Sequence, residues 1–92
     1  MSEEKFIVAH SAGLHARPAA LFVKTCNSFP CEIKVQNVTT GSIVVNAKSV
    51  LSVLILGVDQ GHEILVSAIG EQEKEALVAI KKLIDSNFGD TL

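Results

Sequence analysis

Hydrophobic positions follow two spacings along the chain, one typical of β-strands and the other of α-helices. Short apolar or alternating runs predict strands at residues 5–9, 31–36, 43–47 and 63–69. Apolar residues recur at three- and four-residue steps in two longer segments, which predicts amphipathic helices over 16–28 and 71–87. Phe29-Pro30 and Gly89 mark the ends of these two helices.

The segment 49–56 is apolar at most positions, and its periodicity alone fits either a buried strand or a short helix. Ser49 supplies a side-chain oxygen that can cap a helix, and this favours the helix. Because so short a helix cannot bury all its apolar side chains, we expect Val50, Leu51 and Leu54 at the surface.

The order strand, helix, strand, strand, short helix, strand, helix favours the α+β class. Half-buried strands and amphipathic helices together predict one antiparallel sheet of four strands, with three helices on one face. Within it, 31–36 and 43–47 form a hairpin around a turn at 37–42. A chain of 92 residues suits one small domain, spanning 1–92.

The amino-acid composition argues against two functional classes, nucleic-acid binders and membrane-inserted proteins. The chain has 8 Lys and Arg against 10 Asp and Glu, a formal net charge of −2, and its aromatic residues are 4 Phe. It has neither the basic surface nor the aromatic platform of a nucleic-acid binder, so no nucleic-acid partner is expected. The polar, acidic start at 1–5 and the lack of a long apolar segment predict a cytoplasmic protein without membrane insertion.

The cysteines and two of the histidines lack the spacing of a metal or redox site. Cys26 and Cys31 are expected to behave as small hydrophobic residues in a reducing compartment. His10 and His62 are expected in loops, without a role. The sequence therefore predicts no metal and no cofactor. It also shows no paired carboxylates, which argues against an enzyme that works alone.

The stretch Gly-Leu-His-Ala-Arg-Pro-Ala-Ala at 13–20 carries the most distinctive chemistry. It opens the first predicted helix, with either His15 or Ala16 as the cap. A helix start favours an anion, and Arg17 adds donors suited to phosphate oxygens. Because histidine is a nucleophile near neutral pH, these residues suggest a phosphorylated histidine. The alternative is a surface turn in which His15 and Arg17 only face solvent.

The same stretch resembles the active-site signature of the HPr family, the histidine-containing phosphocarriers of the bacterial phosphoenolpyruvate:sugar phosphotransferase system. The resemblance continues through Asn-Ala-Lys-Ser at 46–49 and Leu-Gly-Val at 56–58, and it covers nearly the whole chain. It implies an open-faced β-sandwich of four strands and three helices, in agreement with the hydrophobic pattern. The predicted hairpin is a few residues longer, at 36–43, than is usual in that family.

The resemblance implies a phosphocarrier of sugar transport that acts only with partner enzymes. His15 would accept a phosphoryl group on Nδ1 from enzyme I, at the expense of phosphoenolpyruvate, and pass it to the A domain of a sugar permease. Arg17 would stabilise the phosphate, with Gly13 and Ala16 in the phosphate-contacting loop. Ala12 departs from the many family members that have a hydrogen-bonding side chain there. We expect a monomer, because transient partners need the His15 face free.

Two further sites are expected, the first from the resemblance and the second from the apolar side chains. Ser49 matches a serine that a serine kinase/phosphorylase modifies in some relatives, and the alternative is that it only caps its helix. An apolar docking surface for partner proteins is expected from Ala16, Ala20, Leu21, Val50, Leu51 and Leu54. The alternative is that some of these side chains complete the core.

A regulatory member of the same family is the main alternative to a sugar-transport carrier. Such a protein, a nitrogen-branch member or a transcription co-regulator, would act mainly by binding other proteins. The chain retains His15 and Arg17, and this favours the carrier.

Overall fold

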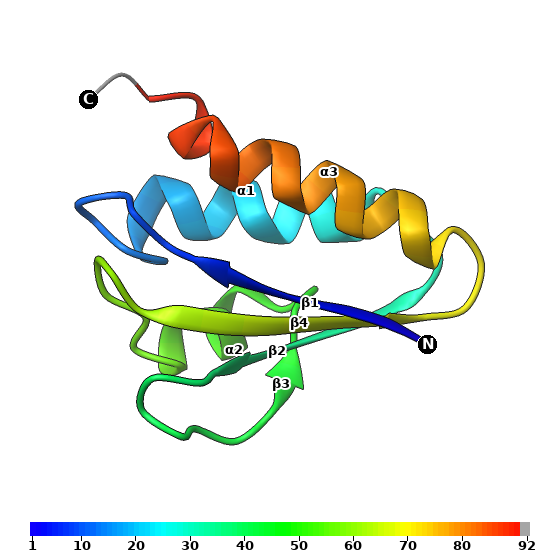
Figure 1. The fold of residues 1–92 in the computed structure, drawn as a ribbon, viewed down its shortest axis with the longest axis horizontal. Helices are drawn as coiled ribbons and strands as arrows, with labels where there is room; N and C mark the ends of the chain where they lie inside the picture. The colour runs from blue at the N-terminus through cyan, green and yellow to red at the C-terminus, as the bar shows by residue number, and fades with distance from the viewer. Residues whose placement is uncertain (91–92) are drawn as a thin grey trace.

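The computed structural model describes residues 1–90 and shows one antiparallel sheet covered by helices. The strands are β1 (Ser2–Ile7), β2 (Glu32–Asn37), β3 (Val45–Asn46) and β4 (Glu63–Ile69). The helices are α1 (Ala16–Asn27), α2 (Val50–Ile55) and α3 (Glu73–Asp85), followed by the 3₁₀-helix η1 (Asn87–Gly89). This confirms the predicted α+β class and the predicted order of elements (Figure 1).

The sheet has the strand order β1-β4-β2-β3, with β4 in the interior. β4 pairs with β1 on one side, where Phe6 lies opposite Ile64, and with β2 on the other, where Val35 lies opposite Val66. These four side chains are buried. Because alternate residues of a strand point to one face, the pairings place the apolar side chains of three strands in one layer.

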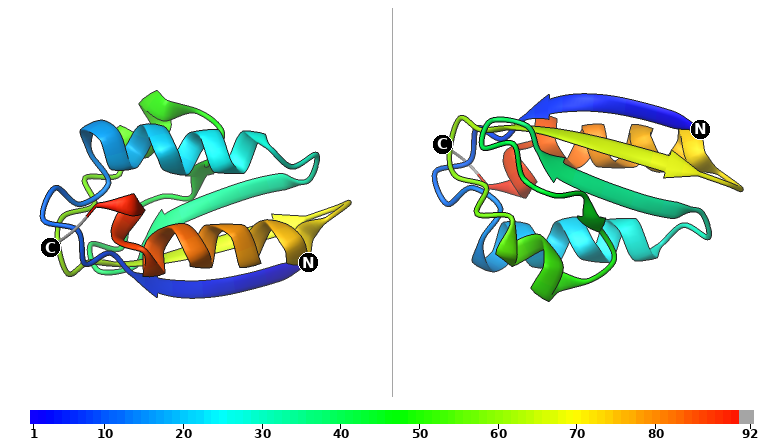
Figure 2. Two further views of the ribbon diagram at one scale, coloured as in Figure 1. Left: turned by 90° about the horizontal axis from the view of Figure 1, so that it is seen from above. Right: turned by 90° about the horizontal axis from the view of Figure 1, so that it is seen from below.

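Helices α1 and α3 lie side by side over one face of the sheet (Figures 1 and 2). Each presents its predicted apolar stripe to the core, and the buried members are Ala19, Phe22 and Cys26 in α1 and Ala76, Leu77, Ile80 and Ile84 in α3. Val23 and Leu83, which complete the two predicted stripes, are partly buried against the same core. The shorter α2 contacts α1 and β3 and buries Val53. Burial of these side chains is the main source of stability, at roughly 1.5–3 kcal/mol for each large one.

The two edge strands differ from their predicted lengths. β1 begins earlier than predicted, because backbone pairing with β4 extends over a polar segment that no hydrophobic pattern marks. β3 is shorter than the predicted 43–47. Its register with β2 would put Ile43 opposite Asn37, but Asn37 exchanges hydrogen bonds with Ser42 instead. Ile43 is therefore outside the strand, with 75% of its surface exposed.

The last helix begins at Glu73, so the predicted start at Glu71 is wrong. The chain enters α3 through Gln72, whose φ of 65° is left-handed and lies outside a helix. The carboxylate of Glu73 accepts hydrogen bonds from the N–H of Gly70 and the hydroxyl of Ser2. These bonds tie the helix start to β1 and lower the pKa of Glu73, with the Ser2 bond as the larger cause.

The chain turns back on itself after α3, and this turn positions the site. α3 ends at Asp85, short of the predicted Asn87. Asn87 and Phe88 then both have a φ of 56°, so the backbone reverses through η1. The reversal buries Phe88 in the core and brings Asp90 to the start of α1. No periodic pattern predicts this turn.

Candidate functional site

His15 is the N-cap of α1, which settles the choice between His15 and Ala16. Its backbone is extended, with φ −128° and ψ 162°, and 39% of its side chain is exposed. Ala16 follows with a φ of 51°, in the left-handed region. For a residue other than glycine that conformation costs on the order of 1–3 kcal/mol. The chain therefore enters the helix through a strained residue directly beside the histidine.

The start of α1 is suited to an anion. The first N–H groups of a helix have no carbonyl partner within it, and Pro18 contributes no N–H. Within residues 1–90, no side chain caps this helix, and its first turn holds no acidic residue. Backbone donors and the positive end of the helix dipole therefore remain available to a negative group beside His15.

The imidazole of His15 contacts a carboxylate from another part of the chain. Its Nε2 lies 3.1 Å from Oδ1 of Asp59, which is 44 residues away in sequence. Since a carboxylate accepts, Nε2–H is the donor, and Nδ1 carries the free lone pair. Sequence reasoning missed Asp59, because its only local signal is a turn between Gly57 and Gly61.

Gly13 shapes the site through its backbone packing. A Cβ at this position would lie 2.2 Å from the carbonyl oxygen of Val58 and 2.8 Å from Cα of Asp59. Gly13, which was predicted to belong to the phosphate-contacting loop, is buried and donates its N–H to the carbonyl of His10 at 2.8 Å. Ala16, the other member of the predicted loop, is exposed.

Arg17 reaches from α1 to the C-terminal turn. Its Nη1 donates to the carbonyl oxygen of Phe88 at 3.2 Å and forms an ion pair with Asp90. The other carboxylate oxygen of Asp90 accepts a hydrogen bond from Nε2 of His10 at 2.6 Å. The hydrogen bond from His10 and then the charge of Arg17 hold the pKa of Asp90 below its ordinary value.

His10 is therefore part of the site's surroundings, although no role was expected for it from the sequence. It is buried, and its ring meets that of Phe88 edge-on at 5.9 Å between centroids. Its Nδ1 accepts the N–H of Ala12 at 3.0 Å, so Nε2 carries the proton donated to Asp90. Neither His10 nor Asp90 stands out in the sequence, because their pairing depends on the turn after α3.

Ser49 caps α2 as predicted, since its side chain accepts the N–H of Ser52 at 3.3 Å. Three predicted docking residues of α2 are exposed: Val50, Leu51 and Leu54. The exposed Ile55 extends this apolar face and was missed. In α1, Ala16 and Ala20 are exposed, while Leu21 is half-buried and packs against the core. The two helices that carry these residues are in contact.

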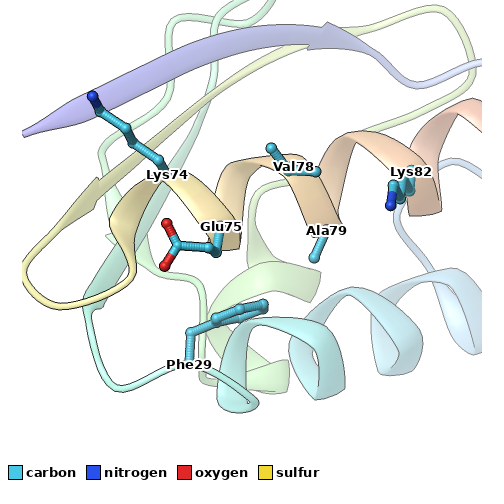
Figure 3. Close-up of a pocket in the computed structure, with 6 residues that line it drawn as sticks. All are labelled: Phe29, Lys74, Glu75, Val78, Ala79 and Lys82. Atoms are coloured by element: carbon cyan, nitrogen blue, oxygen red, sulfur yellow. The ribbon is translucent and has the colours of Figure 1, made fainter.

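Other features of the described residues lie apart from this site. Cys26 and Cys31 are buried free thiols, and burial raises the pKa of Cys26 to about 12. A surface groove lies along α3 and reaches Phe29, just after the C-terminal end of α1 and away from His15. It is lined by Phe29, Lys74, Glu75, Val78, Ala79 and Lys82 (Figure 3). None of the predicted site residues lines it. Within residues 1–90, no helix has the length and apolar character needed to cross a membrane.

Known proteins resemble this chain over nearly its whole length. Residues 2–86 match the family model described as PTS HPr component phosphorylation site. The chain is 37% identical over 84 residues to Phosphocarrier protein HPr of Chlamydia pneumoniae, covering 91% of this chain and 75% of that protein. The crystal structure of HPr-C-His from Thermoanaerobacter tengcongensis matches with a TM-score of 0.93 and 43% identity, covering 100% of both chains.

A longer relative matches through only part of its length. The chain is 39% identical over 87 residues to Multiphosphoryl transfer protein of Haemophilus influenzae. That match covers 95% of this chain but only 17% of the relative.

Proposed function

The chain belongs to the HPr family of phosphocarrier proteins, and we propose that it carries a phosphoryl group on Nδ1 of His15. Enzyme I, charged from phosphoenolpyruvate, is the proposed donor, and the A domain of a sugar permease is the proposed acceptor. The observation that carries this proposal is the environment of the imidazole. Its Nε2–H donates to Asp59, while Nδ1 has no hydrogen-bond partner among residues 1–90 and belongs to the N-cap residue of α1.

The transfer exchanges one phosphorus–nitrogen bond for another. The lone pair of Nδ1 attacks the phosphorus of the donor phosphohistidine, a new N–P bond forms, and the donor nitrogen takes back the electron pair of the broken bond. The His15 ring becomes a phosphorylated imidazolium that keeps its proton on Nε2. The second transfer, to the acceptor, reverses these changes at His15. Because the protein must release what it binds, moderate stabilisation of the phosphoryl group suits it better than a closed pocket.

Arg17 is the proposed phosphoryl-stabilising residue, and its present contacts suggest how it acts. Its guanidinium is exposed and paired with Asp90. A phosphoryl group on Nδ1 competes with that carboxylate for the same N–H donors. We therefore propose that Arg17 exchanges Asp90 for phosphoryl oxygens during transfer, while the His10 hydrogen bond retains Asp90 nearby.

The exposed apolar residues of α1 and α2 are the proposed docking surface for both partners. Val50, Leu51 and Leu54, with Ile55 added, form an uncharged face on a helix that contacts α1. Such a face fits the core of a transient interface. Ser49 lies at its margin, so phosphorylation by a serine kinase would set negative charge beside the apolar face and weaken docking. We further propose that the domain acts as a cytoplasmic monomer.

Intact mass spectrometry tests the proposed function. The protein is mixed with phosphoenolpyruvate and enzyme I, and its mass is measured before and after mild acid. We expect one phosphoryl group, lost in acid and absent in His15→Ala. A demonstrably active enzyme I that adds no mass to the wild-type protein would remove the carrier function and leave the regulatory alternative.

A further inference from the structure

We propose that Asp59 is a positioning residue for His15: it holds the imidazole in the tautomer that transfers a phosphoryl group and offsets the charge the ring acquires. This inference rests on the proposed function and deepens it. It is carried by the contact between Nε2 of His15 and Oδ1 of Asp59 at 3.1 Å. The contact joins the start of α1 to the turn before β4.

The backbone of Asp59 is fixed on both sides of the residue. On the N-terminal side, the carbonyl oxygen of Val58 accepts the N–H of Leu14 at 2.9 Å, and Leu14 is the residue directly before His15. Gly13 packs against Val58 and Asp59 so closely that a Cβ has no space there. The turn that carries the carboxylate and the loop that carries the histidine are thus held together by main-chain contacts.

His62 holds the other side of the turn. The ring Nδ1 of His62 accepts the backbone N–H of Asp59 at 3.1 Å, and the backbone N–H of His62 donates to the carbonyl of Asp59 at 3.0 Å. The same Nδ1 lies 3.2 Å from Nδ2 of Asn37, a fully buried residue whose Nδ2 also donates to the carbonyl of Leu56. His62 therefore anchors the Asp59 backbone to the interior, although no role was expected for it from the sequence.

This arrangement acts on the chemistry in two ways. The carboxylate accepts only, so it favours the proton on Nε2 and leaves the lone pair on Nδ1, the atom next to the helix start. When Nδ1 attacks phosphorus, the ring becomes an imidazolium, and the hydrogen bond to Asp59 becomes charge-assisted. The carboxylate is therefore more strongly bound after transfer has begun than before it. No proton leaves the ring in this step.

The solvent exposure of His15 and Asp59 limits how much their contact can change the rate of phosphoryl transfer. Asp59 has 70% of its side chain exposed, so solvent screens its charge. A screened, charge-assisted hydrogen bond is worth a rate factor of roughly three to ten. Asp59 thus adjusts the transfer rate, whereas the loss of His15 abolishes transfer.

Three variants separate the hydrogen bond, the charge and any general electrostatic effect. Asp59→Ala removes both the acceptor and the charge. Asp59→Asn keeps an acceptor oxygen and nearly the same volume but has no charge. Asp85→Ala is the matched control, because it removes an exposed carboxylate from α3 whose partner is Lys81. Thermal unfolding checks that all three remain folded.

Two measurements are made on each protein. Long-range ¹H–¹⁵N correlation spectra at alkaline pH give the fraction of His15 with the proton on Nε2. Single-turnover mixing with phosphorylated enzyme I gives the transfer rate. We expect Asp59→Ala to lower the Nε2–H fraction and slow transfer by about three- to tenfold. Asp59→Asn should retain the tautomer and transfer at an intermediate rate, while Asp85→Ala should match the wild-type protein in both.

The outcomes separate this proposal from the function on which it rests. An unchanged tautomer fraction in Asp59→Ala would overturn the positioning role, as would wild-type transfer rates in both Asp59 variants or equal slowing in Asp85→Ala. If the wild-type protein accepts no phosphoryl group from active enzyme I, the proposed function fails. The spectra would still report whether Asp59 orients the ring.

Discussion

At the scale of single residues, the site depends on pairs that are distant in sequence. The stretch at 13–20 was enough to nominate His15 and Arg17. Their partners were not predictable, because Asp59 is 44 residues from His15 and Asp90 is 73 residues from Arg17. Asp59 lies in the turn before β4 and Asp90 follows η1, and both look like ordinary surface residues in the sequence. A local motif can identify the reacting atom but not the groups that fold against it.

Gly13 provides the sharpest stability test at this scale. Its Cβ would meet backbone atoms that cannot move aside, and its φ of 64° is also left-handed. We expect Gly13→Ala to lower the free energy of unfolding in urea by more than about 3 kcal/mol. Gly41 has a similar φ of 69° but open space around it, so Gly41→Ala should cost only about 1 kcal/mol. Equal losses in the two variants would rule out the close approach at Gly13.

The lowered pKa of Asp90 predicts that the free energy of unfolding decreases as the pH falls. Its pKa in the folded protein is lowered by the His10 hydrogen bond and by the charge of Arg17. The carboxylate therefore stabilises the fold above the ordinary pKa of an Asp side chain. This stabilisation is lost as the pH falls from there through the lower folded pKa.

Urea unfolding of Asp90→Asn checks that sign. We expect the variant to be less stable than the wild-type protein at about pH 6 and to match it at about pH 2. Asp85→Asn, on an exposed ion pair with Lys81, is the control and should change stability little at either pH. A stability loss in Asp90→Asn that persists at about pH 2 would contradict the role of the ionised carboxylate.

At the scale of elements, agreement was best where one face of an element is buried. β4 spans the predicted 63–69, where an apolar run has every second residue buried in the interior of the sheet. The stripes of α1 and α3 were recognisable for the same reason. β3 was overpredicted, since an apolar run such as Ile43-Val44 can lie exposed when a side chain such as Ser42 takes over the pairing. A hydrophobic pattern indicates which residues are buried. It does not indicate the backbone hydrogen bonds that set the register between two strands.

The apolar face of α2 gives a prediction at the element scale. Leu51 has 68% of its surface exposed, so Leu51→Glu should change the free energy of unfolding by no more than about 0.5 kcal/mol. The charge would lie in the proposed interface core, and we expect transfer from enzyme I to slow by about fivefold or more. The measurement is single-turnover transfer at several enzyme I concentrations.

Ile43→Glu is the matched control for that experiment. It places the same charge on an equally apolar, exposed residue in the loop before β3, outside α1 and α2. Its transfer rate should equal that of the wild-type protein. Equal slowing by both substitutions would point to a general effect of added negative charge and remove α2 from the docking surface.

At the scale of the whole molecule, the topology brings three separate segments to one end of α1. The loop before α1 carries His15, the turn before β4 carries Asp59, and the turn through η1 carries Asp90. The half-buried strands, the amphipathic helices and their order predicted the sheet and its class. The convergence of these turns was not predictable, because it depends on left-handed residues such as Phe88 and on close packing such as that of Gly13.

In the proposed carrier, Nδ1 of His15 bears the phosphoryl group while Nε2 keeps its proton. The most direct measurement is ¹⁵N and ³¹P NMR of histidine-labelled protein after reaction with phosphoenolpyruvate and enzyme I. We predict phosphorus coupled to Nδ1 of His15 and a protonated Nε2. Phosphorus on Nε2, on another residue, or on no residue of the protein with enzyme I active would contradict the claim.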